Sequence, residues 1–305
     1  MIGILFAGQG SQRKNMGLDF YENLREAKEF IDSLEDRDEI LKIFNMEEEE
    51  LTRTKNTQLG LIALETMISH LLCNLDIKAA AGLSIGEYAA LERSGVLSLE
   101  DTFKIAKYRG QRMEEISQKF STDMYALMTD DEKKVRKILE SLNEKAEFAE
   151  VSNINTKGQI VVSGSKNVLD KALIKFKDQK IKAIKLKVSG PFHTSYMKTV
   201  ENDLREYFKD IDFKDPKNNL YLNLSGGKFK EEDLKDLMAR QVSHTVNFKE
   251  IIENMILDGV NTFIEIGFGN VLTKFVKKID KSVKTLSVYD LDSYKKLKEN
   301  LWKVY

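Results

Sequence analysis

The sequence has 305 residues, with 48 basic and 49 acidic side chains and a net charge of −1. This balance leaves no global electric field that would attract nucleic acid or a membrane surface, so we expect neither as a partner. Cys73 is the only cysteine, which excludes an internal disulfide and favours a reducing compartment; we therefore expect a cytoplasmic protein. No stretch approaches the ~20 apolar residues of a membrane span, and the apolar run at residues 2–7 is too short for a signal peptide.

The first part of the chain alternates short apolar runs with longer amphipathic ones. Residues 1–7 are almost entirely apolar, as expected for a strand buried on both faces of a parallel sheet. They lead into the loop Gly8-Gln9-Gly10-Ser11-Gln12, at the sheet edge where α/β proteins place ligands. Residues 77–82 predict a second buried strand. Helical periodicity covers residues 19–44, 58–75 (with Asn56 or Thr57 as its cap), 87–93 and 99–116.

Gly82, Ser84 and Gly86 form the pattern Gly-x-Ser-x-Gly between the predicted strand 77–82 and the predicted helix 87–93. In a nucleophile elbow of this kind, a strand turns sharply into a helix and leaves a serine hydroxyl exposed at the bend. The glycines fit, because side chains at their positions would collide across the turn. The pattern alone leaves two interpretations open, a catalytic serine and an ordinary turn.

The character of the sequence changes at residue 123. Strand-like runs at 124–128, 147–153, 159–163 and 181–188 and helical runs at 130–142 and 167–178 follow in the order β-α-β-β-α-β, which predicts a ferredoxin-like unit. Its second half is basic, with eight lysines and two aspartates between Lys166 and Lys187. A solvated face explains such a run, and a docking surface for an acidic partner is the alternative interpretation.

The α/β pattern resumes after the loop that contains Pro191. Helical runs cover residues 196–208, 231–242, 248–258 and 271–279, and strand-like runs cover 219–224, 262–266 and 285–288. We therefore predict an α/β protein in two domains. A large domain with a doubly wound parallel sheet, residues 1–122 and 190–305, is interrupted by a ferredoxin-like small domain, residues 123–189.

A serine nucleophile needs a base to take its proton, and histidine usually fills this role near neutral pH. The sequence has three histidines. His70 lies within an apolar helical pattern, where a buried structural role is expected, and His244 lies in a polar stretch, where capping or exposure is expected. His193 follows Pro191 in a loop after an apolar strand and is the best-placed base, with an ordinary loop histidine as the alternative.

An acyl-transfer site also needs donors for the oxyanion that develops on the carbonyl oxygen. By elbow geometry, the main-chain N–H of Ile85, directly after the serine, is one donor. The N–H of Gln9 in the glycine-rich loop is the candidate for the second. No acid is placed as an obvious third member of a triad, so we expect a Ser–His dyad whose histidine is oriented by a main-chain carbonyl.

Six motifs occur in one order along the chain, and they resemble the motifs of the malonyl-CoA:acyl carrier protein transacylases in order and approximate spacing. The resemblance covers essentially the whole chain and implies the stand-alone enzyme of bacterial type II fatty-acid synthesis. It also implies an α/β-hydrolase-like large domain with the ferredoxin-like insertion over its mouth. The motifs are Gly8-Gln9-Gly10-Ser11-Gln12, Gly82-x-Ser84-x-Gly86-Glu87-Tyr88, Arg109-Gly110, Asn153-x-Asn155 with Gln159, Gly190-Pro191-Phe192-His193 and Glu265-x-Gly267-x-Gly269-x-x-Leu272.

The resemblance implies a role for each matching residue. Ser84 would accept malonyl as an ester, and His193 would act first as the base and then as the acid that protonates the leaving thiol. Gln9 and Ile85 would supply the oxyanion-hole amides. Arg109 would bind the free carboxylate of malonyl with its planar fork of donors, although its polar helix by itself indicates simple exposure.

Further positions are implied to support the site. Gln58 and Asn155 match polar positions that line it, and Gln241 matches the residue whose main-chain carbonyl orients the histidine. Phe192 and Met124 would set the pocket volume on which acyl selectivity depends. Two departures stand out: Leu83 replaces the histidine usual before the serine, and Leu59 replaces a common proline. Neither departure removes a catalytic group.

The implied reaction uses malonyl-CoA and holo acyl carrier protein as substrates, with no metal and no other cofactor. Acyl carrier protein is usually acidic, so basic residues on the small domain or around the cleft would steer it, and we expect the enzyme to be a monomer. The first alternative is a serine thioesterase or hydrolase that releases the acyl group to water from the same dyad. The second is a non-catalytic carrier-protein docking module, against which the presence of Ser84, His193 and Gln9 counts.

Overall fold

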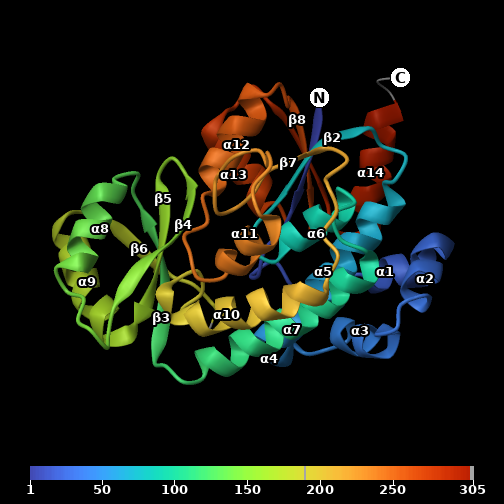
Figure 1. Ribbon diagram of the computed structural model, residues 1–305. Coiled ribbons are helices and arrows are strands. Elements are labelled where there is room, and N and C mark those ends of the chain that lie inside the picture. Colours follow the sequence, from blue (N-terminus) through green and yellow to red (C-terminus); the bar gives the residue numbers. More distant parts are fainter. Residues whose placement is uncertain (189, 303–305) are drawn as a thin grey trace.

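Two separate β-sheets organise the computed structural model, which describes residues 1–188 and 190–302 (Figure 1). One is a five-stranded parallel sheet in the order β7-β2-β1-β8-β9, and the other is a four-stranded antiparallel sheet in the order β4-β5-β3-β6. The predicted α/β class, with a parallel sheet and a separate second sheet, is confirmed. The strands are β1 (Ile2–Phe6), β2 (Ile77–Gly82), β3 (Thr122–Met128), β4 (Ala149–Thr156), β5 (Gln159–Ser165), β6 (Lys182–Lys185), β7 (Asn219–Leu220), β8 (Thr262–Ile266) and β9 (Lys284–Val288).

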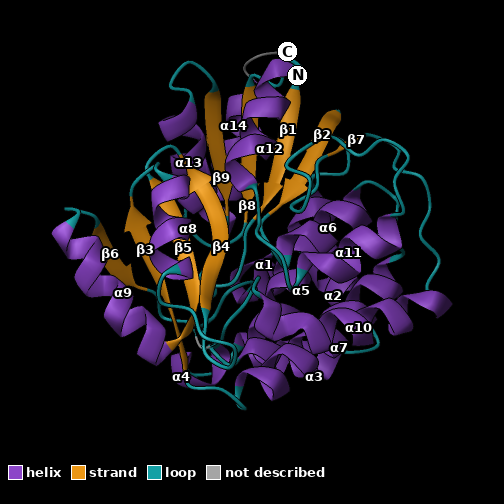
Figure 2. Ribbon diagram, turned by 60° about the vertical axis from the view of Figure 1, so that its left-hand side comes forward, coloured by secondary structure: helices purple, strands orange, loops and turns teal. Residues whose placement is uncertain are grey.

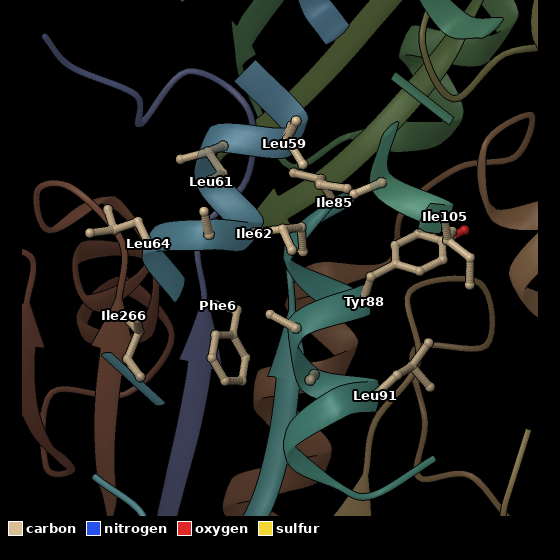
Figure 3. Close-up of a cluster of buried hydrophobic side chains, with 14 of the residues drawn as sticks. Phe6, Leu59, Leu61, Ile62, Leu64, Ile85, Tyr88, Leu91, Ile105 and Ile266 are labelled. Carbon is tan, nitrogen blue, oxygen red and sulfur yellow. The ribbon is translucent and has the colours of Figure 1, made fainter. Parts of the chain in front are cut away.

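Strand β1 lies in the middle of the parallel sheet and is buried on both faces, as its apolar sequence predicts. Ile4 and Phe6 belong to a core shared with α5 (Thr54–Leu71) and α6 (Gly86–Arg93). Leu5 belongs to a second core, shared with α12 (Phe248–Leu257) and α13 (Val271–Ile279). Figure 3 shows the first core, with Phe6 between the helices and the sheet. Helices therefore cover both sides of the sheet, because successive strand side chains point to opposite faces.

The other helices of this part of the chain contribute buried apolar side chains to the core shared with α5 and α6, and most of them lie on that side of the sheet (Figure 2). The sequence predicts helix throughout residues 19–44, but Leu24 is extended at φ −121° and ψ 121° and separates α1 from α2. The predicted cap of α5 is wrong: the helix begins at Thr54, and Asn56 and Thr57 instead donate side-chain hydrogen bonds to carbonyls of the preceding turn. These helices are α1 (Leu18–Asn23), α2 (Arg25–Asp32), α3 (Arg37–Phe44), α4 (Glu48–Leu51), α7 (Leu99–Ser117), α10 (Lys198–Tyr207), α11 (Leu234–Gln241) and α14 (Leu291–Trp302), with 3-10 turns η1 (Ser195–Met197) and η2 (Phe208–Asp210).

The antiparallel sheet carries its own two helices, α8 (Glu132–Glu140) and α9 (Lys166–Asp178). Apolar side chains of both helices, among them Val135 and Phe176, share a core with the sheet. The chain order β3-α8-β4-β5-α9-β6 is the one that the sequence predicts. This unit joins the rest of the molecule along β4, where Asn153 forms a parallel bridge with Val246.

Several local predictions differ from the structure. The predicted strand 219–224 pairs with β2 only at Asn219–Leu220, because the chain then turns back on itself: Leu222 N–H donates to Gly227 O at 3.0 Å, and Gly226 N–H donates to Leu222 O at 2.9 Å. The sequence predicts a buried His70, but the side chain is exposed near the end of α5, with its ring 5.2 Å from that of Phe30. Ser189, the last residue of the predicted small domain, and residues 303–305 of the predicted large domain lie outside the described residues. Among the described residues, no helix combines the length and apolar character needed to cross a bilayer.

Candidate active site

Ser84 lies on a sharp turn between β2 and α6. Its φ of 57° falls in the left-handed region, which non-glycine residues rarely occupy. A Cβ at Gly82 would come within 2.0 Å of the main-chain carbon of Gly86, and one at Gly86 would come within 2.4 Å of the Phe6 carbonyl oxygen. Only glycine therefore fits at positions 82 and 86, two residues before and two residues after Ser84. The strand–turn–helix context that the Gly-x-Ser-x-Gly pattern requires is present.

His193 faces Ser84 across the site. Its Nε2 lies 2.7 Å from Ser84 Oγ, and its Nδ1 lies 2.8 Å from the main-chain oxygen of Gln241. A carbonyl can only accept, so Nδ1 carries the proton and Nε2 is left to accept one from the serine hydroxyl. The histidine has a φ of 59°, and its own N–H donates to Val242 O at 3.0 Å.

The environment of His193 keeps its imidazole neutral. The side chain is almost completely buried. Burial, together with the nearby positive charge of Arg109, lowers the pKa of His193 to about 3, against the opposing effect of the hydrogen bond to Gln241. A neutral imidazole with a free Nε2 lone pair is the form that accepts a proton from a serine.

Arg109, on α7, is fully buried beside the dyad rather than exposed as its helix alone indicates. Its Nη2 donates to Ser84 Oγ at 3.2 Å and to Gln241 Oε1 at 3.0 Å, and its Nη1 donates to Gln58 Oε1 at 2.7 Å. The ring of Tyr88 lies 5.5 Å from the guanidinium carbon. All three hydrogen-bond acceptors are neutral, so the hydrogen bonds that hold the guanidinium leave its charge available to an anionic ligand.

A set of polar residues behind the elbow was not anticipated from the sequence. Asn223 Oδ1 accepts the Ser84 N–H at 2.8 Å, and its Nδ2 donates to Gly82 O at 2.6 Å. Glu87 accepts from the Asn223 N–H at 2.7 Å and from Gln241 Nε2 at 2.8 Å. Burial raises the pKa of Glu87 to about 7, against these hydrogen bonds and the charge of Arg109. Nothing in the local pattern marks Asn223, whereas Glu87 stands directly after the elbow glycine.

A cavity of about 290 Å³ opens in front of Ser84 and His193. Of the residues singled out in the sequence, it brings together Gln9, Asn155, Phe192 and Met124 with the dyad. Gln58, Arg109, Gln241 and Ile85 do not line it: Gln58 contacts Arg109 and Met113 behind the serine. The lining residues are Gly8, Gln9, Leu83, Ser84, Met113, Met124, Ala126, Asn153, Asn155, Gln159, Val161, Leu186, Val188, Phe192, His193, Val271 and Phe275.

The two expected oxyanion donors are available. Ser84 N–H is already bound to Asn223, but within residues 1–188 and 190–302 the main-chain N–H groups of Gln9 and Ile85 donate to no acceptor. Gln9 also lines the cavity, with its side-chain Nε2 buried. The arrangement thus combines a serine hydroxyl, a neutral histidine, uncommitted main-chain donors and a buried guanidinium, the groups that acyl transfer to and from a serine requires.

Comparison with known proteins points to the same class of enzyme. Residues 4–300 match the acyl transferase domain family. The chain therefore belongs to the acyl transferase family.

The relatives within this family narrow the assignment. A malonyl CoA-acyl carrier protein transacylase of Staphylococcus aureus (strain MRSA252) is 37% identical over 302 residues, which cover 97% of this chain and 98% of the relative. The enzyme of the same name from Bacillus subtilis is 35% identical over 299 residues, 95% of this chain and 93% of the relative. The crystal structure of the Clostridium perfringens transacylase superposes with a TM-score of 0.91 at 36% identity, covering 99% and 98% of the two chains. The resemblance inferred from the six motifs is confirmed.

Proposed function

We propose that this protein transfers malonyl from malonyl-CoA to the phosphopantetheine thiol of acyl carrier protein by a ping-pong mechanism, and that it thereby feeds fatty-acid biosynthesis. One observation carries the proposal: Ser84 Oγ lies 2.7 Å from His193 Nε2 and 3.2 Å from Arg109 Nη2. A nucleophile–base pair thus stands directly beside a buried cation that fits a carboxylate. One solved neighbour, 26% identical with a TM-score of 0.90, is a malonyl-transacylase in complex with its acyl-carrier protein.

In the first half-reaction, Ser84 Oγ attacks the thioester carbon of malonyl-CoA while His193 Nε2 takes the hydroxyl proton. The Oγ–C bond forms, and the negative charge that develops on the carbonyl oxygen is received by the N–H groups of Gln9 and Ile85. The C–S bond then breaks, and His193 returns its proton to the sulfur of CoA. In the second half-reaction the phosphopantetheine thiol attacks the malonyl-Ser84 ester by the same steps in reverse.

Arg109 receives the free carboxylate of malonyl. Gln58 and Gln241 hold its guanidinium in place through their side-chain oxygens, so the planar fork is oriented before the substrate arrives. A guanidinium in a buried site binds a carboxylate with two charge-assisted hydrogen bonds. In the cavity, Phe192 and Met124 limit the space beside the acyl chain, and Asn155 offers a polar contact.

The fold labels and the partners form part of the same proposal. The parallel sheet with its elbow supports an α/β-hydrolase-like large domain, and the strand order β4-β5-β3-β6 with two helices on one face supports a ferredoxin-like small domain. We place the domain limits at 1–122, 123–189 and 190–305. The partner is acyl carrier protein. The monomeric state, the cytoplasmic location and the absence of a cofactor stay predictions.

The test is detection of the acyl-enzyme. Incubation with malonyl-CoA and mass spectrometry of the peptide that carries Ser84 should show a malonyl adduct, and Ser84→Ala should show none. Addition of holo acyl carrier protein should discharge the adduct and produce malonyl-carrier protein. A malonyl adduct on Ser84→Ala would refute the mechanism, and free malonate as the main product in the presence of carrier protein would favour the thioesterase alternative.

A further inference from the structure

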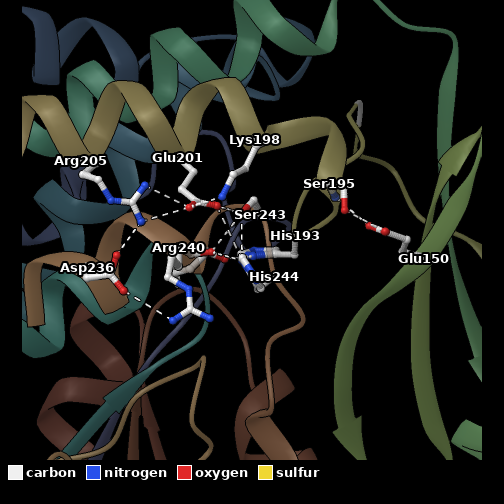
Figure 4. A network of polar contacts seen from close by, with 11 residues as sticks. Glu150, His193, Ser195, Lys198, Glu201, Arg205, Asp236, Arg240, Ser243 and His244 are labelled. Carbon is white, nitrogen blue, oxygen red and sulfur yellow. Dashed lines mark hydrogen bonds and ion pairs between the residues drawn. The ribbon is translucent and has the colours of Figure 1, made fainter. Parts of the chain in front are cut away.

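Glu201, on α10, is a fully buried carboxylate that makes no contact with Ser84 or with the substrate cavity. Its Oε1 accepts hydrogen bonds from Lys198 Nζ at 2.5 Å and from the two terminal nitrogens of Arg205, each at 3.2 Å. Its Oε2 accepts a hydrogen bond from the hydroxyl of Ser243 (Figure 4). A buried carboxylate with this many donors is held in place, because each lost bond would leave its charge less well compensated.

Ser243 belongs to the segment that orients His193. The two residues before it, Gln241 and Val242, supply the carbonyl oxygens that accept from the His193 side chain and main chain. The next residue, His244, has its Nδ1 2.9 Å from the Arg240 carbonyl and 3.8 Å from Glu201 Oε2. Glu201 therefore holds the residue that directly follows the two carbonyl groups to which His193 is hydrogen-bonded.

The helix that carries Glu201 is also tied to the His193 loop. Glu201 follows His193 by eight positions, through η1 and the first turn of α10. Arg205 bridges Glu201 and Asp236 Oδ1 on α11, at 3.2 Å and 2.5 Å. The carboxylate of Glu201 thus connects the segment that carries His193 with the segment that carries Gln241 and Val242. Figure 4 shows the side chains around Glu201 meeting between α10 and α11.

The carboxylate is ionised. Burial favours the neutral form, but the hydrogen bonds from Lys198, Ser243 and Arg205 outweigh it and hold the pKa of Glu201 below its ordinary value. A fixed negative charge attracts the Ser243 hydroxyl more strongly than a neutral amide would.

We propose that Glu201 is a positioning residue for His193: through Ser243 it fixes the carbonyls of Gln241 and Val242, and so keeps the imidazole aligned with Ser84. This inference rests on the proposed function only in taking His193 as the base. A displacement of a catalytic group by about 1 Å can cost on the order of 100-fold in rate. The hydrogen bond between Glu201 and Ser243 lies two residues from the Gln241 carbonyl, so its loss should reduce the rate by a smaller factor than this.

The alternative is that Glu201 only anchors α10 to α11, and a matched control separates the two. Asp203 lies two positions along the same helix and accepts from Arg112 Nη2 at 2.7 Å, which ties α10 to α7 without touching residues 240–244. Asp203→Asn also removes one negative charge from α10, and it weakens the contact between α10 and α7. Glu201→Gln keeps the shape of the side chain and removes the charge that holds Ser243.

The experiment measures the reactivity of Ser84 with a small alkyl fluorophosphonate, in wild type, Glu201→Gln and Asp203→Asn. Ser84 Oγ bonds to phosphorus, the P–F bond breaks, fluoride leaves, and His193 takes the proton, so the rate depends on the dyad and not on malonyl or carrier protein. Steady-state malonyl transfer and thermal unfolding are measured in parallel. If wild type reacts at Ser84 but transfers no malonyl, the proposed function fails and the positioning role can still be judged.

We expect Glu201→Gln to react 5- to 20-fold more slowly than wild type and to lose a similar factor in kcat, with KM for malonyl-CoA changed less than twofold. Asp203→Asn should stay within twofold of wild type in both reactions. Equal rates for Glu201→Gln and Asp203→Asn would overturn the proposal. If Glu201→Gln does not fold, Ser243→Ala replaces it: a loss of at least threefold in fluorophosphonate reactivity supports the proposal, and an unchanged rate overturns it.

Discussion

At the scale of single residues, the charge of Arg109 is the feature that distinguishes this site from a simple esterase. The guanidinium is fully buried, and the three oxygen atoms that accept its hydrogen bonds come from Gln58, Gln241 and Ser84. None of them carries a formal charge. A carboxylate on the acyl group would pair with the positive charge of the guanidinium, whereas an acetyl group has no charge to offer.

Arg109→Ala should therefore change which acyl group is transferred. Loss of a bidentate, charge-assisted contact of about 3 kcal/mol predicts a fall of roughly 100-fold in kcat/KM for malonyl-CoA. Transfer from acetyl-CoA should be spared or improved. The measurement is the ratio of kcat/KM for the two substrates. Arg112→Ala is the matched control, because Arg112 lies on the same helix and pairs with Asp203, and it should leave the ratio unchanged. Equal losses on both substrates after Arg109→Ala would contradict a carboxylate-binding role.

The pH dependence of acylation should reflect the unusual environment of His193. Because burial and Arg109 lower the pKa of His193 to about 3, the imidazole stays unprotonated at mildly acidic pH. Acylation by acetyl-CoA should then show no inflection from His193 between pH 8 and pH 5, whereas an ordinary histidine would be half protonated near pH 6.5. Arg109→Ala removes the second cause of the lowered pKa, so its acid limb should move to higher pH.

A second group near the site could titrate in the same pH range, because burial raises the pKa of Glu87 to about 7. Glu87→Gln removes this group and is therefore the control for the pH profile. Rates are compared in wild type and Glu87→Gln over the same pH range. An inflection near pH 6.5 that persists in Glu87→Gln would show that His193 titrates normally, and would contradict the prediction.

At the scale of elements, the elbow depends on two glycines that touch the sheet. Gly86→Ala would bring a Cβ within 2.4 Å of the Phe6 carbonyl oxygen, and that oxygen belongs to the central strand. Overpacking against a rigid backbone costs about 3 kcal/mol or more, so the free energy of unfolding should fall by that amount. Urea unfolding measures it. Gly227→Ala is the control, since its Cβ would meet nothing closer than 3.9 Å; a similar loss for both variants would contradict the argument.

The sequence predicts those parts of the fold and of the site whose residue pattern is set by neighbouring residues in the chain. The apolar run that forms β1 and the Gly-x-Ser-x-Gly pattern are readable, because burial and a tight turn impose residue types at fixed spacing. Arg109 is not readable in this way, because its helix is polar and its side chain is buried by residues from three other elements: Gln58 of α5, Tyr88 of α6 and Gln241 of α11. Asn223 shows the same limit. Its role depends on β7 ending after two residues, which the longer strand-like run at 219–224 conceals.

At the scale of the whole molecule, the site lies where segments distant in the sequence meet. Ser84 comes from the elbow after β2, His193 from the loop that returns from the small sheet, and Gln241 from the end of α11. The small sheet adds Met124 and Asn155 to the cavity wall. Assembly of the site therefore requires the native fold of both sheets, so the pH dependence of global stability bears directly on activity.

Glu65 should make that stability fall as the pH rises. It is fully excluded from solvent within α5, and burial raises the pKa of Glu65 well above its ordinary value of 4.5; the Ala7 main chain opposes the shift and the Glu265 carboxylate adds to it. Above pH 4.5 the unfolded chain releases a proton from this residue that the folded protein retains. The unfolded state then binds fewer protons, and the free energy of unfolding decreases with pH by up to about 1.4 kcal/mol per unit.

Glu65→Gln removes this proton without changing the shape of the side chain. Urea unfolding at pH 5 and at pH 8 should show that the variant loses less stability between the two pH values than wild type does. Glu48→Gln serves as control, because Glu48 is exposed on α4, and it should follow the wild-type profile. Parallel profiles for wild type and Glu65→Gln would mean that Glu65 ionises equally in the folded and unfolded chains. A buried carboxyl that stays protonated in the folded protein requires the profiles to diverge, with Glu65→Gln relatively more stable at pH 8 than at pH 5.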